Sequence, residues 1–272
     1  MKARSIDVVV LAGERPGGNA LAQSLGLPSA LLAEVAGKAV IRWTFDALFA
    51  ANHARLMLVG PQSHLLKQHE VFAQLADDPR VQWLEPQDGP AASAVYGIER
   101  LAAYPILLTA ADHALLQGRW VDDFVKRSLQ TAQTTNADIV VGLVPYASVA
   151  QEFPKSKRTL LRFADGLFCG SNLFLVATPQ GLRAVRFWRS LERLRKSPWR
   201  MASALGWRLC IRYLLRRLSL EDAMAALSDA AGCRVQVCKL TEPRLAVDVD
   251  SLADYELASS LLGAATSPHT LS

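Results

Sequence analysis

Three groups of residues have the types and the spacing that phosphate and metal chemistry needs. The first is a loop at 13–18, which contains three glycines and Arg15 and directly follows a largely apolar run at 6–11. Glycines let backbone N–H groups approach phosphate oxygens, and an arginine adds a bidentate donor. The glycines fit neither the Walker A nor the dinucleotide-binding pattern. The loop is therefore either a phosphate cradle of another kind or a simple turn after a first strand.

The second group is centred on Asp112, which follows a buried-type apolar run at 106–111. An acidic residue just past the carboxyl end of a parallel strand lies at the edge where open α/β sheets bind ligands. Such a residue could hold Mg²⁺ or Mn²⁺, which take one or two carboxylates together with phosphate oxygens. The alternative is that Asp112 caps a short helical turn at 113–117.

The third group is Asp248 and Asp250, which alternate along a predicted strand end. Alternation places both side chains on one face, so either or both could join a metal held by Asp112. Asp250 or Ser251 could instead open the last helix, with Asp254 in its first turn. The cap and ligand roles are compatible.

Positive charge is concentrated at 183–217, where eleven basic residues face a single acidic one. Because the net charge of the chain is +5, the remainder is net acidic. This asymmetry indicates an anionic partner, such as a nucleotide phosphate, a phosphorylated substrate or the surface of an anionic membrane. We favour the interpretation that this segment is a helical subdomain, with its aromatic residues in the core and its arginines solvated, over a membrane-binding surface. Nucleic acid is not expected as a partner, since no known binding module is recognisable.

The elements that must position these residues alternate along the first half of the chain. Strands separated by helix-length segments predict an α/β protein with a mostly parallel sheet and helices on both faces. In the first half we expect strands at 6–11, 56–59, 81–84, 106–109 and 139–144, and helices at 40–51, 65–75, 92–101 and 120–132. In the second half we expect strands at 159–163, 171–176 and 234–239, helices at 183–195, 201–217 and 220–230, and a final strand, loop and helix at 245–262.

Composition excludes several classes of protein. Hydrophobic residues make up 51% and charged residues 20%, which excludes a disordered or collagen-like chain. No run of about 18 apolar residues and no signal peptide is recognisable. The four cysteines lack metal-ligand spacing and are expected to be reduced, packed thiols. We expect one domain at 1–265 with a helical subdomain at about 179–231, a flexible tail at 266–272, and a cytoplasmic location, with peripheral contact at the inner face of a membrane through 183–217 as the open alternative.

Five segments, taken in their order along the chain, resemble the motifs of the MobA-like NTP transferases. These enzymes include molybdenum-cofactor guanylyltransferase and nucleotidyltransferases that act on sugar and alcohol phosphates. The resemblance implies a Rossmann-like GT-A fold and covers essentially the whole chain. The segments are VLAGER at 10–15, VAGKAVI at 35–41, GPAAS at 89–93, ADH at 111–113 and DVD at 248–250.

The resemblance also implies roles for particular residues. The glycine-rich loop of the family binds nucleotide phosphates, and the mid-chain segment helps to hold the base. Two aspartates of the family hold Mg²⁺, and a later segment orients the acceptor. The corresponding residues here are Leu11, Ala12, Gly13, Glu14, Arg15, Gly17 and Gly18 for the phosphates; Gly89 and Ser93 for the base; Asp112 and Asp250, with Asp248 as the competing choice, for the metal; and Gly170 and Asn172 for the acceptor.

The chain departs from the family pattern at one point. Family members usually carry a lysine shortly before the Ala-Gly-Lys segment, where it steadies the α-phosphate. This chain has PSALL at 28–32 instead. Losing such an electrostatic clamp typically costs about 10²–10³-fold in rate. Arg15 and Lys38 are the nearby cations that could compensate, and with Asp112 they form the expected catalytic set.

The reaction that the resemblance implies is transfer of a nucleoside monophosphate from an NTP to a phosphorylated small molecule, with release of pyrophosphate. A sugar, polyol or cofactor phosphate is already ionised at neutral pH and needs no general base, so the protein would supply positioning and charge neutralisation. One alternative is a degenerate member that binds nucleotide or a partner without turnover. Another is a glycosyltransferase that uses a nucleotide sugar, which normally needs an Asp-x-Asp that 111–113 lacks.

Overall fold

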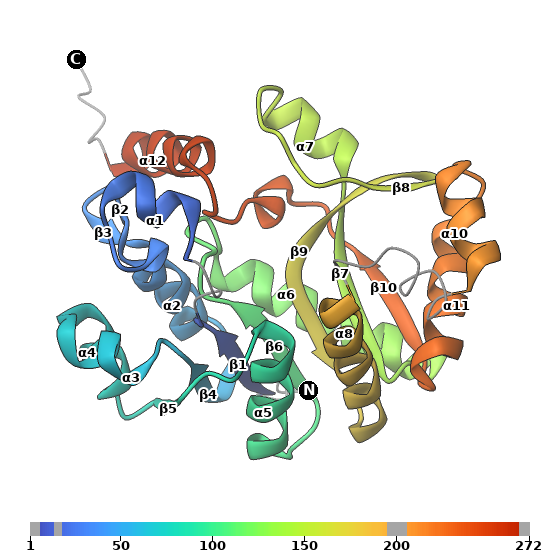
Figure 1. The fold of residues 1–272 in the computed structure, drawn as a ribbon, viewed down its shortest axis with the longest axis horizontal. Coiled ribbons are helices and arrows are strands. Elements are labelled where there is room, and N and C mark those ends of the chain that lie inside the picture. The colour runs from blue at the N-terminus through green and yellow to red at the C-terminus, as the bar shows by residue number, and fades with distance from the viewer. Residues whose placement is uncertain (1–5, 14–17, 195–205, 267–272) are drawn as a thin grey trace.

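A computed structural model of the chain describes residues 6–13, 18–194 and 206–266. Its centre is one eight-stranded sheet in the order β10-β7-β9-β6-β1-β4-β5, with β8 paired to β9 (Figure 1). Glu14, Arg15 and Gly17 and most of the predicted tail lie outside the described residues. The strands are β1 Ile6–Leu11, β4 His53–Val59, β5 Val81–Leu84, β6 Ile106–Ala110, β7 Ile139–Pro145, β8 Leu161–Phe163, β9 Gly166–Val176 and β10 Val235–Lys239.

The sheet is mostly parallel, as predicted. Strands β5, β4, β1 and β6 run parallel to one another, and β10 runs parallel to β7. Strand β9 is inserted between β6 and β7 and runs antiparallel to both. The carboxyl ends of β1 and β6 therefore lie side by side, which is the edge where Asp112 was expected.

Helices cover both faces of the sheet because the central strands are apolar on both sides. In β1, Val8 and Val10 join the core on the face of α2 and α6, whereas Val9 joins the core under α5 and α8 (Figure 1). The helices are α1 Ala20–Leu25, α2 Val40–Ala50, α3 Ser63–Gln68, α4 Glu70–Ala76, α5 Pro90–Leu101, α6 Gly118–Thr135, α7 Tyr146–Glu152, α8 Leu182–Leu194, α10 Trp207–Leu214, α11 Leu220–Ala231 and α12 Leu252–Thr266. A small hairpin joins β2 Glu34–Val35 to β3 Lys38–Ala39, and 3-10 turns lie at η1 Ala30–Leu32, η2 Pro179–Gly181 and η3 Pro243–Ala246.

Two predicted elements were wrong. The single helix expected at 65–75 is divided into α3 and α4 at His69, whose extended backbone (φ −125°, ψ 114°) interrupts the helix. The strand expected from 245 is absent from the described sheet. Pro243 begins the η3 turn, and the buried side chains of Leu245, Val247 and Val249 pack into the core without a partner strand. An apolar run indicates that a segment is buried, but it does not show whether the segment pairs with another strand, which explains the second error.

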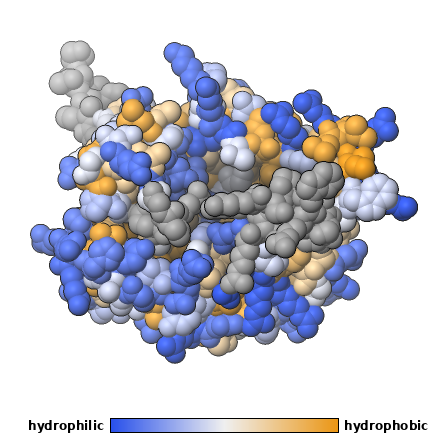
Figure 2. All heavy atoms as spheres, viewed as in Figure 1, coloured by the Kyte–Doolittle hydropathy of each residue, from blue (hydrophilic) through white to orange (hydrophobic). Residues whose placement is uncertain are grey.

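The basic segment at 183–217 divides into two helices. These two helices are α8 and α10. Helix α8 packs on α5, and α11, which follows the segment, packs on β10, so α8 and α11 both cover the sheet. Helix α10 lies beyond β8 at the upper right of Figure 1, and hydrophobic atoms are gathered at the surface there in Figure 2. Residues 195–205, where part of the second predicted helix falls, lie outside the described residues. None of the described helices is both long enough and apolar enough to cross a bilayer.

Three of the four cysteines are expected to resist modification in the native protein. Cys169, Cys233 and Cys238 are buried, and burial raises the pKa of each thiol, which reduces the reactive thiolate. Cys210 on α10 is half-buried. A chromogenic thiol reagent should label Cys210 first and reach the other three only after unfolding by urea. Rapid labelling of all four thiols without denaturant would contradict this packing.

Candidate active site

A cleft of about 440 Å³ opens at the carboxyl ends of β1 and β6. Its floor is the end of β6, including Thr109, and one side is the loop after β1, including Gly13. The segment that follows η3 supplies Asp248 and Asp250. Phe174 and Trp188 form an aromatic wall, with their rings stacked 6.3 Å apart between centroids.

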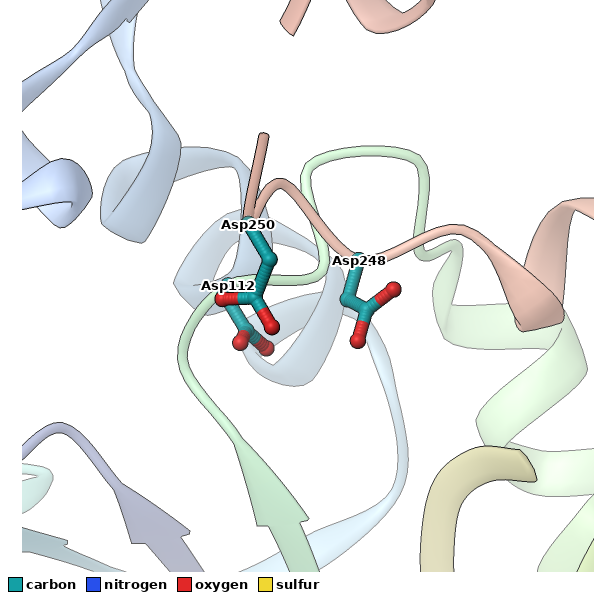
Figure 3. Close-up of side chains that lie close together, drawn as sticks. All are labelled: Asp112, Asp248 and Asp250. Atoms are coloured by element: carbon teal, nitrogen blue, oxygen red, sulfur yellow. The ribbon is translucent and has the colours of Figure 1, made fainter. Parts of the chain in front are cut away.

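Three aspartates converge in the cleft. One carboxylate oxygen from each of Asp112, Asp248 and Asp250 lies within 4.8 Å of the other two (Figure 3). The backbone N–H of Val249 donates to the carbonyl oxygen of Asp112 at 3.0 Å, which fixes the C-terminal segment against the loop after β6. Although this segment is not a strand, its extended backbone turns both flanking aspartates toward Asp112. Like charges at this separation repel, so the arrangement favours a cation.

Arg158 partly neutralises the charge of this cluster. It lies in a loop for which the sequence analysis predicted no functional residue. Its side chain is only 6% exposed, donates to Asp248 at 3.1 Å and forms a second ion pair with Asp254. Ser251 and Asp254 form reciprocal hydrogen bonds at the start of α12, which is the capping arrangement considered from the sequence. The arginine therefore connects the cluster to the first turn of the last helix.

Asp250 is held by a residue at the end of the glycine-rich loop. The side-chain oxygen of Asn19 accepts from the backbone of Leu21 at 2.8 Å and caps α1, while its Nδ2 donates to Asp250 at 3.4 Å. Sequence reasoning missed Asn19. An Asn directly before a helix, at the end of a glycine-rich loop, is the signal that could have identified it.

Asn172 reaches the cluster because β9 is irregular. The pairing of β9 with β7 shifts between Val141 and Leu143, and Asn172 takes a left-handed backbone there (φ 50°). A β-bulge of this kind re-aims a side chain. The Nδ2 of Asn172 consequently lies 3.5 Å from Asp248 as a hydrogen-bond donor. Gly170 is exposed on β9 and is not among the described residues that line the cleft.

The described part of the glycine-rich loop faces the cleft through Leu11, Ala12, Gly13 and Gly18. Gly60, at the end of β4, holds this loop from behind. Its backbone is left-handed (φ +97°), and a Cβ atom there would lie 2.7 Å from both the carbonyl carbon of Ala12 and the nitrogen of Gly13. A side chain at this position would therefore displace the loop.

We expect Gly60→Ala to destabilise the protein by about 2–4 kcal/mol, because backbone strain and overpacking add. The same change should weaken stabilisation by nucleotide, since the loop moves. Gly26→Ala is the matched control: Gly26 is also left-handed (φ +65°), but no atom lies within 4 Å of its added Cβ. Urea unfolding and nucleotide-dependent thermal shifts measure both effects. Equal losses in the two variants would contradict the close approach.

The segment at 89–93 begins α5 beside the cleft. Gly89 is left-handed (φ +96°), and Pro90 lines the cleft. Ser93 is buried, and its hydroxyl accepts from the backbone of Gln87 at 2.9 Å, so it stabilises the turn before the helix. The carboxylate of Glu192 on α8 accepts from Ala91 at 3.3 Å. This contact holds α8, and with it the Trp188 wall, against the start of α5.

Of the cations expected to replace the family lysine, the structure describes Lys38. Its ammonium group lies 2.6 Å from Asp46 and 4.0 Å from the centre of the Trp43 ring. Lys38 is not among the described residues that line the cleft. The segment where the lysine is absent does line it, through Ala30 and Leu31, so the wall there is apolar.

His113 follows Asp112 and is buried. Neither ring nitrogen has a hydrogen-bond partner among the described residues. Burial lowers the pKa of His113, and nearby Arg158 adds to this, while Asp248 opposes it. This environment favours the neutral form of the imidazole.

Comparisons with known proteins agree with this fold. The sequence model of the MobA-like NTP transferase domain matches residues 8–161, which is more than half of the chain. The chain therefore belongs to the MobA-like NTP transferase family, as the motifs predicted. No curated protein sequence matches the chain.

Three solved structures that are similar to the chain carry the names of a transferase, a synthetase and a synthase. A hypothetical transferase of Thermus thermophilus has 26% identity and a TM-score of 0.75, over 93% of this chain and 100% of that one. A CMP:2-keto-3-deoxy-manno-octonic acid synthetase complexed with CTP has 13% identity and a TM-score of 0.58, over 97% and 100%. A 4-diphosphocytidyl-2C-methyl-D-erythritol synthase of Anaerococcus prevotii has 10% identity and a TM-score of 0.53, over 95% and 96%. The last two share the GT-A-like fold of this chain.

Proposed function

We propose that this protein is a Mg²⁺-dependent nucleotidyltransferase that transfers a nucleoside monophosphate from an NTP to a phosphorylated small molecule and releases pyrophosphate. The observation that carries the proposal is the convergence of Asp112, Asp248 and Asp250 in a cleft that the glycine-rich loop also lines. Family membership and similarity to a synthetase complexed with CTP support it.

The donor set fits a divalent cation. Mg²⁺ and Mn²⁺ prefer carboxylate oxygens and usually leave positions for water and phosphate. Asp112 and Asp250 are the proposed ligands, and Asp248, already paired with Arg158 and Asn172, is the competing choice. When bound, such an ion neutralises phosphate charge and acts as a Lewis acid.

The chain's own residues would bind and orient the two substrates. Backbone N–H groups of the loop that contains Gly13 and Gly18 are proposed to hold the NTP phosphates, together with Arg15. The start of α5 at Gly89 is proposed to lie beside the base. Asn172 and the backbone near Gly170 would orient the acceptor, whose ionised phosphate needs no proton removed before attack.

A second candidate function is nucleotide binding without turnover. The apolar wall at Ala30 and Leu31, where relatives carry a lysine, favours it. A nucleotide-sugar glycosyltransferase is less well supported, because the chain has no Asp-x-Asp directly after β6. Both alternatives keep nucleotide binding, and neither releases pyrophosphate, which distinguishes them from the proposed nucleotidyltransferase.

The test is thermal shift and pyrophosphate release with ATP, CTP, GTP and UTP, each with and without Mg²⁺ and with sugar, polyol and cofactor phosphates as acceptors. The proposal expects base-selective, Mg²⁺-dependent stabilisation and acceptor-dependent pyrophosphate. Stabilisation without pyrophosphate for any acceptor would favour the binding protein. If millimolar nucleotide shifts the melting temperature in no case, both candidates fail.

A further inference from the structure

Helix α10 presents an apolar face to solvent. Trp207, Ile211, Leu214 and Leu215 are 64%, 45%, 78% and 59% exposed. Their spacing of i, i+4, i+7 and i+8 places them on one side of the helix. In Figure 2 orange atoms gather beside blue ones at the upper right, the region where Figure 1 places α10. Scattered exposed apolar residues are normal, but a continuous stripe on one helix face marks an interaction surface.

The opposite side of α10 is anchored to the protein. The ring of Tyr213 packs edge-on against Phe163, with 6.0 Å between centroids, and its hydroxyl accepts from the backbone of Arg162 at 3.3 Å. Leu209 and Cys210 are half-buried on this side. The apolar stripe is therefore held outward by packing.

Arginines border the apolar stripe. Arg208, Arg212, Arg216 and Arg217 are all exposed, and the guanidinium of Arg208 lies 5.5 Å from the centre of the Trp207 ring. Arg212 pairs with Asp222. For the other three, no acidic partner is found in the part of the chain that the structure describes. The surface thus combines apolar side chains with uncompensated positive charge.

We propose that α10 is a docking surface for an anionic lipid bilayer, on which the helix lies in the interface. Interfacial helices combine Trp and Leu on one face with arginines that reach phosphate groups at the border. A second copy of this chain is disfavoured as the occupant, because a two-fold contact would bring the same arginines together. The inference is independent of the proposed function.

The test is sedimentation of the full chain with vesicles of phosphatidylcholine, alone or mixed with phosphatidylglycerol. We expect binding that requires phosphatidylglycerol and weakens as salt is raised. The double variant Trp207→Ser and Leu214→Ser should bind at least about tenfold more weakly, because it removes apolar area that the membrane would bury. Leu252→Ser is the matched control, since Leu252 is also exposed (46%) but lies on α12. Circular dichroism verifies that each variant is folded.

Three results would overturn the proposal. The first is equal binding to both kinds of vesicle or to neither. The second is equal loss of binding in the α10 variant and in Leu252→Ser. The third is a wild-type chain that binds no vesicles but forms a concentration-dependent dimer, seen by light scattering, which the α10 variant abolishes. That result would assign the surface to a second copy of the chain.

Discussion

The Asp112→Asn variant is expected to lose pyrophosphate release by about 10³-fold, because it removes a charge that no neighbouring residue can replace in position. Asparagine keeps the size and hydrogen-bonding capacity of the side chain. Asp112 lies within 4.8 Å of two other carboxylates. Relief of that repulsion should keep or slightly raise the melting temperature without metal. Stabilisation by Mg²⁺ with nucleotide should disappear. Thermal shift and a pyrophosphate assay measure both effects.

A purely structural Asp112 would behave differently. If this residue only caps the turn after β6, Asp112→Asn would change the metal-free melting temperature and leave the Mg²⁺-dependent increment intact. Asp46→Asn is the control, because Asp46 is an exposed aspartate paired with Lys38, a residue not found among those that line the cleft. If Asp46→Asn also lost the Mg²⁺-dependent stabilisation, the assay would be responding to the net charge of the protein and not to a specific metal site.

The Arg158→Ala variant is expected to lower the free energy of unfolding by about 2–3 kcal/mol, because it leaves Asp248 and Asp254 without their shared cation. The Asp254 side chain is largely buried and the Asp248 side chain is partly open to the cleft, which places the loss below that of a fully buried pair. Arg158→Lys should recover part of the stability, since one ammonium cannot reproduce both contacts. Urea unfolding measures the difference.

Arg244→Ala provides the matched comparison for Arg158. Arg244 forms an exposed pair with Glu152 at 3.2 Å, and such surface pairs contribute less than about 1 kcal/mol. If Arg158→Ala cost no more than Arg244→Ala, the buried ion pairs would not connect the cluster to α12 as described.

The parts of the fold and site that local patterns specify were predictable. Apolar runs flanked by helix-length segments identified the strands that end at the cleft. An acidic residue after β6 and an alternating pair near the C-terminus indicated Asp112, Asp248 and Asp250. These inferences needed only the two-residue period of extended chain and the position of strand ends.

The parts that depend on distant contacts were not predictable. Arg158 and Asn19 act through partners about 90 and 230 residues away in sequence. The position of Asn19 before α1 indicates a helix cap, but no local pattern indicates its contact with Asp250 or the ion pairs of Arg158. Helical spacing also leaves open which face of α10 is covered. Of the aromatic residues expected in a helical core, Tyr213 packs inward, whereas Trp207 is exposed.

Titration with Mn²⁺, followed by the electron paramagnetic resonance signal of the free ion, tests most directly whether these carboxylates hold a metal beside nucleotide. The account predicts that the wild-type chain binds an Mn²⁺ ion in the presence of a non-hydrolysable NTP, and that Asp112→Asn binds it at least about tenfold more weakly because a charged ligand is lost. Equal Mn²⁺ binding by the two proteins, measured with the same nucleotide, would contradict the account.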